Sequence, residues 1–271
     1  MKRDTMLLGT KLRRPSIPPR RVPRQHLIAR LNDGLAAGHQ LTLVSAPAGF
    51  GKTTVAAEWV SAFDGPSAWL SLDPADDDPA RFAAYLVAAL QEVDERVGAG
   101  VEGALRGGHL PPPGALSTAL LNDILEVDTR FLLVLDDLQV VQDRFIYDVL
   151  EQFITHDPAP LHLVLVTRED PPLSLARLRA HNRLTEIRAE DLRFTGCEAD
   201  SFLNKVMGLA LSQADLDELD AKIEGWIAGL QLVAIALRTA SPGDHPLADS
   251  TGSRFIAGLS GSHRFILSYL T

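Results

Sequence analysis

Residues 46–53 of the 271-residue chain read Ala46-Pro47-Ala48-Gly49-Phe50-Gly51-Lys52-Thr53. The apolar segment Gln40–Ser45 precedes this stretch, and a sequence of helical character follows it through Trp59. Four residues between a small residue and Gly-Lys-Thr match the phosphate-binding loop, with Ala46 where glycine is usual. A strand, a glycine-containing loop and a helix in this order predict an α/β fold with a mostly parallel sheet flanked by helices.

The chemistry of this loop points to a nucleotide. Glycines 49 and 51 let the backbone curl so that its N–H groups converge on phosphate oxygens, and the following helix adds the positive end of its dipole. Lys52 is expected to reach the β- and γ-phosphates, and the Thr53 hydroxyl to ligate Mg²⁺. We therefore predict a P-loop NTPase that takes ATP or ADP with Mg²⁺ and binds it through Pro47, Ala48, Gly49, Phe50, Gly51, Lys52, Thr53 and Thr54.

Two acids and one arginine complete the predicted catalytic set. Asp136 and Asp137 follow the apolar run Phe131–Leu135, and ligands of open α/β sheets gather where such strands end. Asp136 is placed to hold Mg²⁺ through water, and Asp137 either polarises an attacking water or caps the next turn. Arg168 follows another apolar run, where it either senses the γ-phosphate or pairs with the acids beside it.

Changes in composition and residue pattern along the chain predict four segments. An extended, basic lead-in covers residues 1–24, a nucleotide-binding domain residues 25–193, a small helical domain residues 194–253, and the start of a further, winged-helix-like domain residues 254–271. The last apolar stretch, Arg264–Leu270, ends without a cap, so we expect the natural chain to continue.

Apolar patterns place the individual elements. Besides Gln40–Ser45, strands are expected at Ser67–Leu72, Phe131–Leu135, Leu161–Thr167 and Glu186–Arg188. Helices are expected at Gln25–Leu35, from Asp78 to Leu90, at Leu116–Leu125, at Phe145–Ile154, from Ser212 to Leu219 and at Gly225–Arg238. The glycine- and proline-rich stretch 98–114 and the polar stretch 241–253 are expected to be loops, and Thr195/Glu198 and Ser212/Asp215 to be capping boxes.

Composition excludes several classes of protein. The single cysteine, Cys197, rules out an intramolecular disulfide and a multi-cysteine zinc site, and it fits a cytoplasmic location. No apolar run approaches the length of a membrane span. The lead-in holds eight Lys and Arg against one acid, but no aromatic residue stands among them, so we expect it to pack on the acidic body rather than to bind nucleic acid. The acidic run 73–78 either assists Mg²⁺ or, as we expect, is a solvated loop in which Asp78 caps a helix.

Several further stretches are distinctive: Leu7–Leu12, Val22–Arg24, Ala68–Asp73, Asp76–Phe82, Thr167–Arg179, Asp191–Thr195 and Glu224–Leu230. Together with the phosphate loop they resemble the STAND-class ATPase domain of the large, MalT-like LuxR-family transcriptional regulators. The resemblance covers nearly the whole chain. It implies an ADP-bound resting monomer that self-associates when ATP and an inducer bind. It also implies that DNA is bound only by a C-terminal helix-turn-helix, which this chain does not contain.

The same resemblance assigns roles beyond the phosphate loop. It implies that Val22 and Arg24 flank the adenine and that the helical domain closes over the nucleotide around Gly229 and Leu230. Related ATPases often carry Gly-Leu-Pro-Leu there, whereas this chain has Gln231 in place of the proline. The resulting prediction is a nucleotide switch that is reset by slow ATP hydrolysis. The alternatives are a P-loop kinase or phosphotransferase acting on a small molecule, and a nucleotide-binding scaffold without hydrolysis.

Overall fold

The computed structural model describes residues 7–240 and residue 256. Contacts between Cα atoms divide the chain into two compact units, which are described separately. The first, here called the sheet unit, comprises the residues up to Ile17, Gln25–Ala46 and Lys52–Arg188. The second, here called the helical unit, comprises Pro18–Arg24, Pro47–Gly51 and the residues from Ala189 onward.

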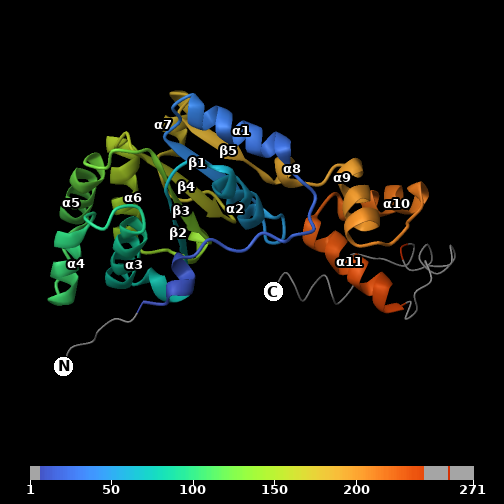
Figure 1. Cartoon of the computed structure of the whole chain (residues 1–271), viewed down its shortest axis with the longest axis horizontal. Coiled ribbons are helices and arrows are strands. Elements are labelled where there is room, and N and C mark those ends of the chain that lie inside the picture. Colours follow the sequence, from blue (N-terminus) through green and yellow to red (C-terminus); the bar gives the residue numbers. More distant parts are fainter. Residues whose placement is uncertain (1–6, 241–255, 257–271) are drawn as a thin grey trace. The chain divides into compact units, whose positions relative to one another are not determined.

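A five-stranded sheet with the order β2-β3-β4-β1-β5 forms the centre of the sheet unit (Figure 1). All four strand pairs are parallel, which confirms the predicted sheet. The register places Ser45 opposite Thr167 and Leu135 opposite Leu165, so the carboxyl ends of β1, β4 and β3 lie at one edge. The strands are β1 (Leu41–Ser45), β2 (Ser67–Ser71), β3 (Phe131–Asp136), β4 (Leu161–Thr167) and β5 (Leu184–Ile187).

Helices cover both faces of this sheet because its central strands are buried along their whole length. Trp59 of α2 packs edge-on against His162 of β4 on one face, with α1 beside α2. The other face carries the main apolar core, to which α3, α5 and α6 contribute. The helices of the unit are α1 (Gln25–Ala36), α2 (Lys52–Ala62), α3 (Pro79–Gln91), α4 (Ala99–Arg106), α5 (Pro113–Leu125), α6 (Arg144–His156) and α7 (Leu175–Ala180).

Several elements of the sheet unit differ from those expected. The stretch 98–114 is not a continuous loop, because it contains α4, whose Val101 is buried against the core. Gly100 and Gly103 lie inside this helix, where apolar burial outweighs the low helix propensity of glycine. The last strand begins at Leu184 rather than Glu186, and the short helix α7 was not predicted.

The acidic run 73–78 is not a solvated loop. Asp76 is fully buried, and its carboxylate pairs with Lys11 and with Arg81 Nε, the latter at 2.9 Å. Lys11 lies in a 3-10 turn, Gly9–Leu12, and is the buried residue of that turn, so this part of the lead-in is not extended. Asp78 does cap α3 through the amide of Arg81, as expected.

The helical unit consists of helices, and two of them begin at capping boxes that can be recognised in the sequence. Both predicted capping boxes, Thr195 with Glu198 and Ser212 with Asp215, are confirmed. The helices are α8 (Ala189–Leu192), α9 (Gly196–Asp200), a π-helical turn (Ser201–Val206), α10 (Gln213–Ile223) and α11 (Ile227–Ala240). They enclose a second apolar core. Its members include Val22, Phe194, Leu203, Leu219, Leu230, Val233 and Ile256.

The predictions for 241–253 and Arg264–Leu270 lie outside the described residues, as does the segment 254–271 apart from Ile256. Across residues 7–240, no helix has both the length and the hydropathy that a bilayer span requires.

Candidate functional site

The sheet unit brings Thr53 and Asp136 into direct contact. Thr53 lies in the first turn of α2, and Asp136 is the last residue of β3. The Thr53 hydroxyl donates a hydrogen bond of 3.0 Å to Asp136 Oδ1, which also accepts from the backbone N–H of Asp137 at 3.1 Å. Two oxygen donors of the kind that Mg²⁺ prefers are therefore held side by side at the carboxyl edge of the sheet.

Charged groups surround this pair in a poorly solvated setting. Burial, reinforced by the nearby charge of Asp137, raises the pKa of Asp136 to about 6. Burial also lowers the pKa of Lys52, while its electrostatic neighbours are Asp137, Arg168 and Asp136. The predicted residues Lys52, Thr53, Asp136, Asp137 and Arg168 thus gather at one place.

Asp137 has a backbone conformation that few residues adopt. Its φ of 59° and ψ of 38° lie in the left-handed region, and its side chain makes no capping hydrogen bond to the turn that follows. The carboxylate instead accepts a hydrogen bond of 2.8 Å from the side-chain amide of Gln139. The side chain therefore does not cap the turn that follows, and the catalytic role of Asp137 stays a prediction.

Gln139 connects the two neighbouring strand ends. While its Nε2 donates to Asp137, its Oε1 accepts a hydrogen bond of 3.0 Å from the backbone N–H of Arg168. Arg168 itself is exposed at the end of β4, the strand that lies between β1 and β3 in the sheet. One amide side chain therefore fixes both the orientation of Asp137 and the path of the backbone at Arg168.

The helical unit holds the glycine-containing part of the phosphate loop, Pro47–Gly51. Gly49 and Gly51 have φ values of 80° and 79°, which are the conformations that their predicted role requires. The loop carbonyls are held from α11 and the residue before it. Trp226 Nε1 donates to the carbonyl of Ala48 and the backbone N–H of Ala228 to that of Gly49, each at 3.0 Å. Chain connectivity joins this part to the sheet unit at the Gly51–Lys52 peptide bond.

Val22 and Arg24 also belong to the helical unit. Val22 packs in its apolar core, and Arg24 is 3% exposed. The Arg24 guanidinium donates to three consecutive carbonyls, those of Asp191, Leu192 and Arg193, and its Nε lies 2.8 Å from Glu198 Oε1. This side chain anchors the segment 18–24 to α8 and α9, and the adenine contact expected of the two residues stays a prediction.

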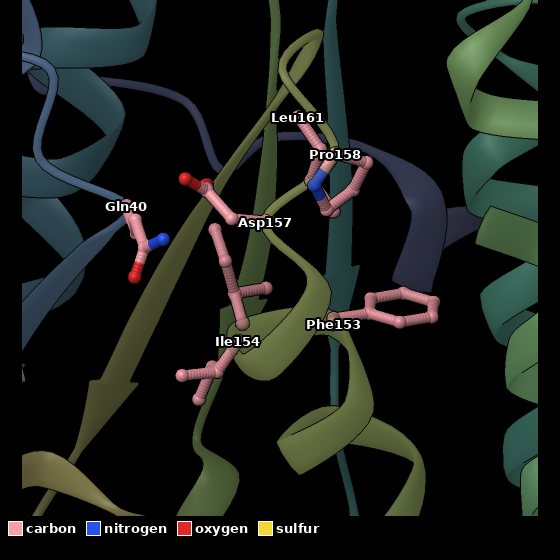
Figure 2. A pocket seen from close by; sticks show the side chains of 7 residues that line it. Gln40, Phe153, Ile154, Asp157, Pro158 and Leu161 are labelled. Atoms are coloured by element: carbon pink, nitrogen blue, oxygen red, sulfur yellow. The ribbon is translucent and has the colours of Figure 1, made fainter. Parts of the chain in front are cut away.

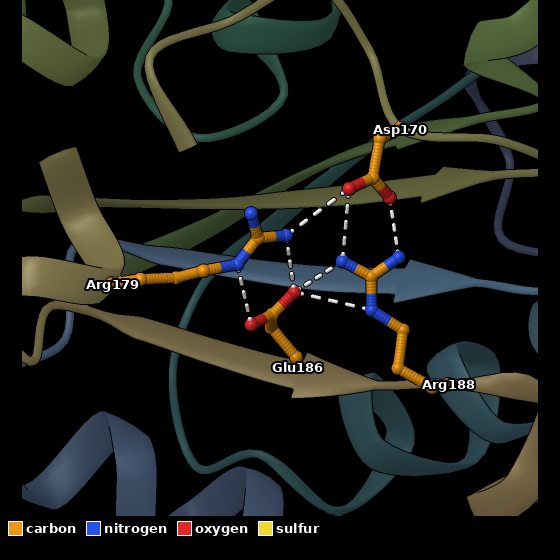
Figure 3. Close-up of polar contacts among 4 residues, drawn as sticks. All are labelled: Asp170, Arg179, Glu186 and Arg188. Carbon is orange, nitrogen blue, oxygen red and sulfur yellow. Dashed lines mark hydrogen bonds and ion pairs between the residues drawn. The ribbon is translucent and has the colours of Figure 1, made fainter. Parts of the chain in front are cut away.

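A four-residue ionic network fixes the segment that follows Arg168. Two carboxylates and two guanidinium groups alternate in it, as Figure 3 shows for Asp170, Arg179, Glu186 and Arg188. Arg179 Nη2 lies 2.8 Å from Glu186 Oε1 and 3.1 Å from Asp170 Oδ2. Hydrogen bonds from the arginines hold the pKa of Asp170 and of Glu186 below their usual values. The network ties the end of β4 to β5.

Two hollows of the sheet unit are separate from the cluster around Thr53 and Asp136. One of about 10 Å³ sits at the amino-terminal ends of β1 and β4, where Gln40, Asp157 and Leu161 line it (Figure 2). It has room for about one water molecule. A second, open hollow of about 530 Å³ is lined by residues of α6 and by Pro172–Ser174. No residue predicted to bind phosphate lines either one.

Sequence reasoning missed one residue in each unit that holds a predicted site residue. Gln139 gave no signal beyond its position three residues after Asp136. Trp226 is partly buried, and its indole N–H holds the phosphate loop by the carbonyl of Ala48. Its flanking glycines, Gly225 and Gly229, were the available signal. Within residues 7–240 and 256, no group of three or more His, Cys, Asp or Glu side chains is arranged to hold a metal ion.

Comparison with known proteins gives consistent matches to one kind of regulator. No family model matches the chain. The chain is 34% identical over 258 residues to the HTH-type transcriptional regulator MalT of Yersinia enterocolitica and, over the same length, to that of Serratia proteamaculans. Both alignments cover 95% of this chain and 28% of the relative. The chain therefore spans little more than a quarter of the length of these curated relatives.

Solved structures agree on the fold. A STAND protein with a tetratricopeptide repeat sensor from Pyrococcus horikoshii matches with a TM-score of 0.57 and 16% identity, over 87% of this chain and 32% of that one. The Walker-type ATPase of Pyrococcus abyssi matches with a TM-score of 0.56 and 14% identity, over 86% of this chain and 73% of that one. At these identities the likeness shows the P-loop NTPase fold.

Proposed function

We propose that this chain, which is homologous to part of the MalT-like regulators over 95% of its length, is the ATP/ADP-binding switch module of such a regulator. The observation that carries the proposal is the Thr53–Asp136 hydrogen bond beside the buried Lys52, directly after a loop whose two glycines have left-handed backbone angles. Oxygen donors, a cation and a loop of converging amides are the groups that a nucleotide triphosphate requires.

The residues present fit a magnesium ion. Thr53 offers a hydroxyl and Asp136 a carboxylate, and burial of Asp136 disfavours its charge until a cation balances it. Thr53 would hold the ion directly and Asp136 through water. When bound, Mg²⁺ neutralises charge on the β- and γ-phosphates.

The remaining residues supply positioning and a way to distinguish ATP from ADP. Lys52 contacts the β- and γ-phosphates, and Arg168 extends its charge toward the γ-phosphate, which ADP lacks. A nucleotide shifts a conformational equilibrium only by its differential affinity for the two states, so these γ-phosphate contacts are the source of the switch. Asp137 orients the attacking water, and slow hydrolysis then resets the module.

The partners of the whole regulator are also part of the proposal. In the ATP state the full-length protein self-associates, and a C-terminal helix-turn-helix outside this chain binds DNA. Support comes from the relatives, which are named HTH-type transcriptional regulators. This chain aligns with 28% of their length.

Co-purified nucleotide provides the test. The protein is denatured, and the released nucleotide is identified and quantified by chromatography. We expect about one ADP per chain. Lys52→Ala should abolish retention, whereas Lys205→Ala, at an exposed position in the helical unit, should not. Retention by Lys52→Ala would refute the assignment of the phosphate loop. Rapid, partner-independent phosphoryl transfer to a metabolite would instead favour a kinase, and unchanged ATP after long incubation with Mg²⁺ would favour a scaffold.

A further inference from the structure

The amino-terminal end of α11 and the residue before it hold the phosphate loop by its carbonyl groups. Trp226 Nε1 donates to the carbonyl of Ala48 at 3.0 Å, and the backbone N–H of Ala228 donates to the carbonyl of Gly49 at 3.0 Å. Gly51 also lies close to this segment, because a Cβ there would be 3.1 Å from Ile227 Cδ1. All of these residues belong to the helical unit.

Because of the geometry of the peptide bond, these two hydrogen bonds also orient two N–H groups of the loop. In a planar trans peptide, the C=O and the N–H point in opposite directions. Holding the carbonyl of Ala48 therefore turns the N–H of Gly49 the other way, and holding the carbonyl of Gly49 does the same for the N–H of Phe50. These are amides of the loop that is expected to cradle phosphate.

We propose that Trp226 and the backbone amide of Ala228 are positioning groups that pre-orient the loop amides Gly49 N–H and Phe50 N–H for a nucleoside diphosphate or triphosphate. The inference rests on the proposed function and adds to it a role for the segment Glu224–Leu230. Trp226 acts here through the loop and does not touch the ligand.

The two glycines beside Trp226 are required for this arrangement. Gly225 has a φ of 70°, and a Cβ there would lie 2.4 Å from the carbonyl oxygen of Phe194. A Cβ on Gly229 would lie 2.5 Å from Cε3 of Trp226, so only glycine leaves room for the indole ring in its present position. The sequence Gly-Trp-Ile-Ala-Gly thus places one indole N–H and one backbone N–H against the phosphate loop.

This arrangement couples the loop to α11. If α11 fixes the loop in its phosphate-binding conformation, then phosphate binding must by reciprocity stabilise α11 in its place. Phosphate binding at the loop should therefore stabilise the position of α11 through these two hydrogen bonds.

Trp226→Phe tests the proposal because it removes the N–H donor and keeps an aromatic ring. The matched control is Trp69→Phe, which removes a buried indole N–H whose partner is Ser71 Oγ at 3.0 Å in the sheet unit. Affinities for ADP and for AMP are measured by competition with a fluorescent ADP analogue, and the thermal midpoint is measured without nucleotide. Loss of one neutral hydrogen bond should weaken ADP binding about two- to tenfold. AMP, which lacks the β-phosphate, should bind unchanged, and the thermal midpoint should fall no further than in Trp69→Phe.

Gly229→Ala provides a second variant, since its methyl group displaces the indole ring without removing it. It should show the same selective loss of ADP affinity, whereas Gly114→Ala, at a helical position in α5 with open space around it, should not. Equal weakening of ADP and AMP in Trp226→Phe, or an ADP affinity equal to that of Trp69→Phe, would overturn the positioning role alone. A wild-type chain that binds no ADP would overturn the proposed function as well.

Discussion

The hydroxyl of Thr53 and the carboxylate of Asp136 lie 3.0 Å apart, although 83 residues separate them in the sequence. They meet because β1 and β3 end at the same edge of a parallel sheet, with β4 between them. The contact joins the helix after the phosphate loop to the acid at the end of β3. The two oxygen donors that we propose as magnesium ligands thus already lie side by side in the protein.

Asp136→Asn should stabilise the protein without ligand while it removes the response to magnesium. Burial raises the pKa of Asp136 to about 6, so at neutral pH the native state carries a carboxylate that its surroundings disfavour. Removing this charge should raise the free energy of unfolding by about 1–3 kcal/mol, measured by urea denaturation at pH 7.5. Addition of Mg²⁺ should no longer tighten ATP binding. Asp148→Asn, on the exposed side of α6, serves as the control, and a destabilised Asp136→Asn would contradict this account.

Gln139→Leu should slow ATP hydrolysis while ADP affinity stays the same. The variant frees the carboxylate of Asp137 and the backbone N–H of Arg168, which Gln139 now holds at 2.8 and 3.0 Å. We expect a decrease of roughly 10-fold or more in the single-turnover rate, because the Asp137 carboxylate, which we propose orients the attacking water, loses its fixed position. Gln91→Leu in α3 is the matched control, since its amide donates to Glu102 at 3.3 Å and lies away from Asp137 in the sequence. Equal hydrolysis rates in the two variants would exclude a role for Gln139.

The buried His162 should make the free energy of unfolding depend on pH. Burial lowers the pKa of His162 to about 4 from 6.5, so between these values the unfolded chain binds a proton that the folded chain does not. His162 should therefore lower the free energy of unfolding by up to about 3 kcal/mol as the pH is lowered from about 6.5 toward 4, whereas Asp136, whose pKa is raised to about 6, contributes the opposite slope below that pH. In His162→Gln this part of the slope should disappear, whereas exposed His109→Gln should keep it. Parallel stability profiles for His162→Gln and the wild type would refute this prediction.

Lys11→Met should destabilise the sheet unit. Lys11 and Asp76 are both buried and paired, and removing one partner leaves a buried charge less compensated. Because Arg81 still pairs with Asp76 at 2.9 Å, we expect a loss of about 2–3 kcal/mol in the free energy of unfolding. Arg13→Met, at an exposed position of the same segment, should change it by less than about 0.5 kcal/mol. A loss no larger than that of the control would show that the buried pair is dispensable.

Local and continuous signals explain what could be predicted from the sequence. The strand at Leu161–Thr167 is apolar throughout because both of its faces are buried, and its bounds agree with the structure. The capping box at Thr195 needs only residues three apart. The phosphate loop is a contiguous motif, so its glycine conformations followed from spacing alone.

Long-range pairings explain what the sequence did not predict. The burial of Asp76 depends on Lys11, which lies 65 residues away, and no local pattern connects the two. The role of Trp226 depends on a carbonyl 178 residues away, in the phosphate loop. Helix α4 was missed for a different reason, because its glycines suggested a loop and its burial is a tertiary effect.

Whether the chain binds an adenine nucleotide can be measured by titration calorimetry of the wild-type protein with ADP and Mg²⁺. We predict heat with a stoichiometry of about one nucleotide per chain and none in Lys52→Ala. Absence of heat with both ADP and ATP, in protein whose circular dichroism and thermal transition show that it is folded, would contradict this prediction.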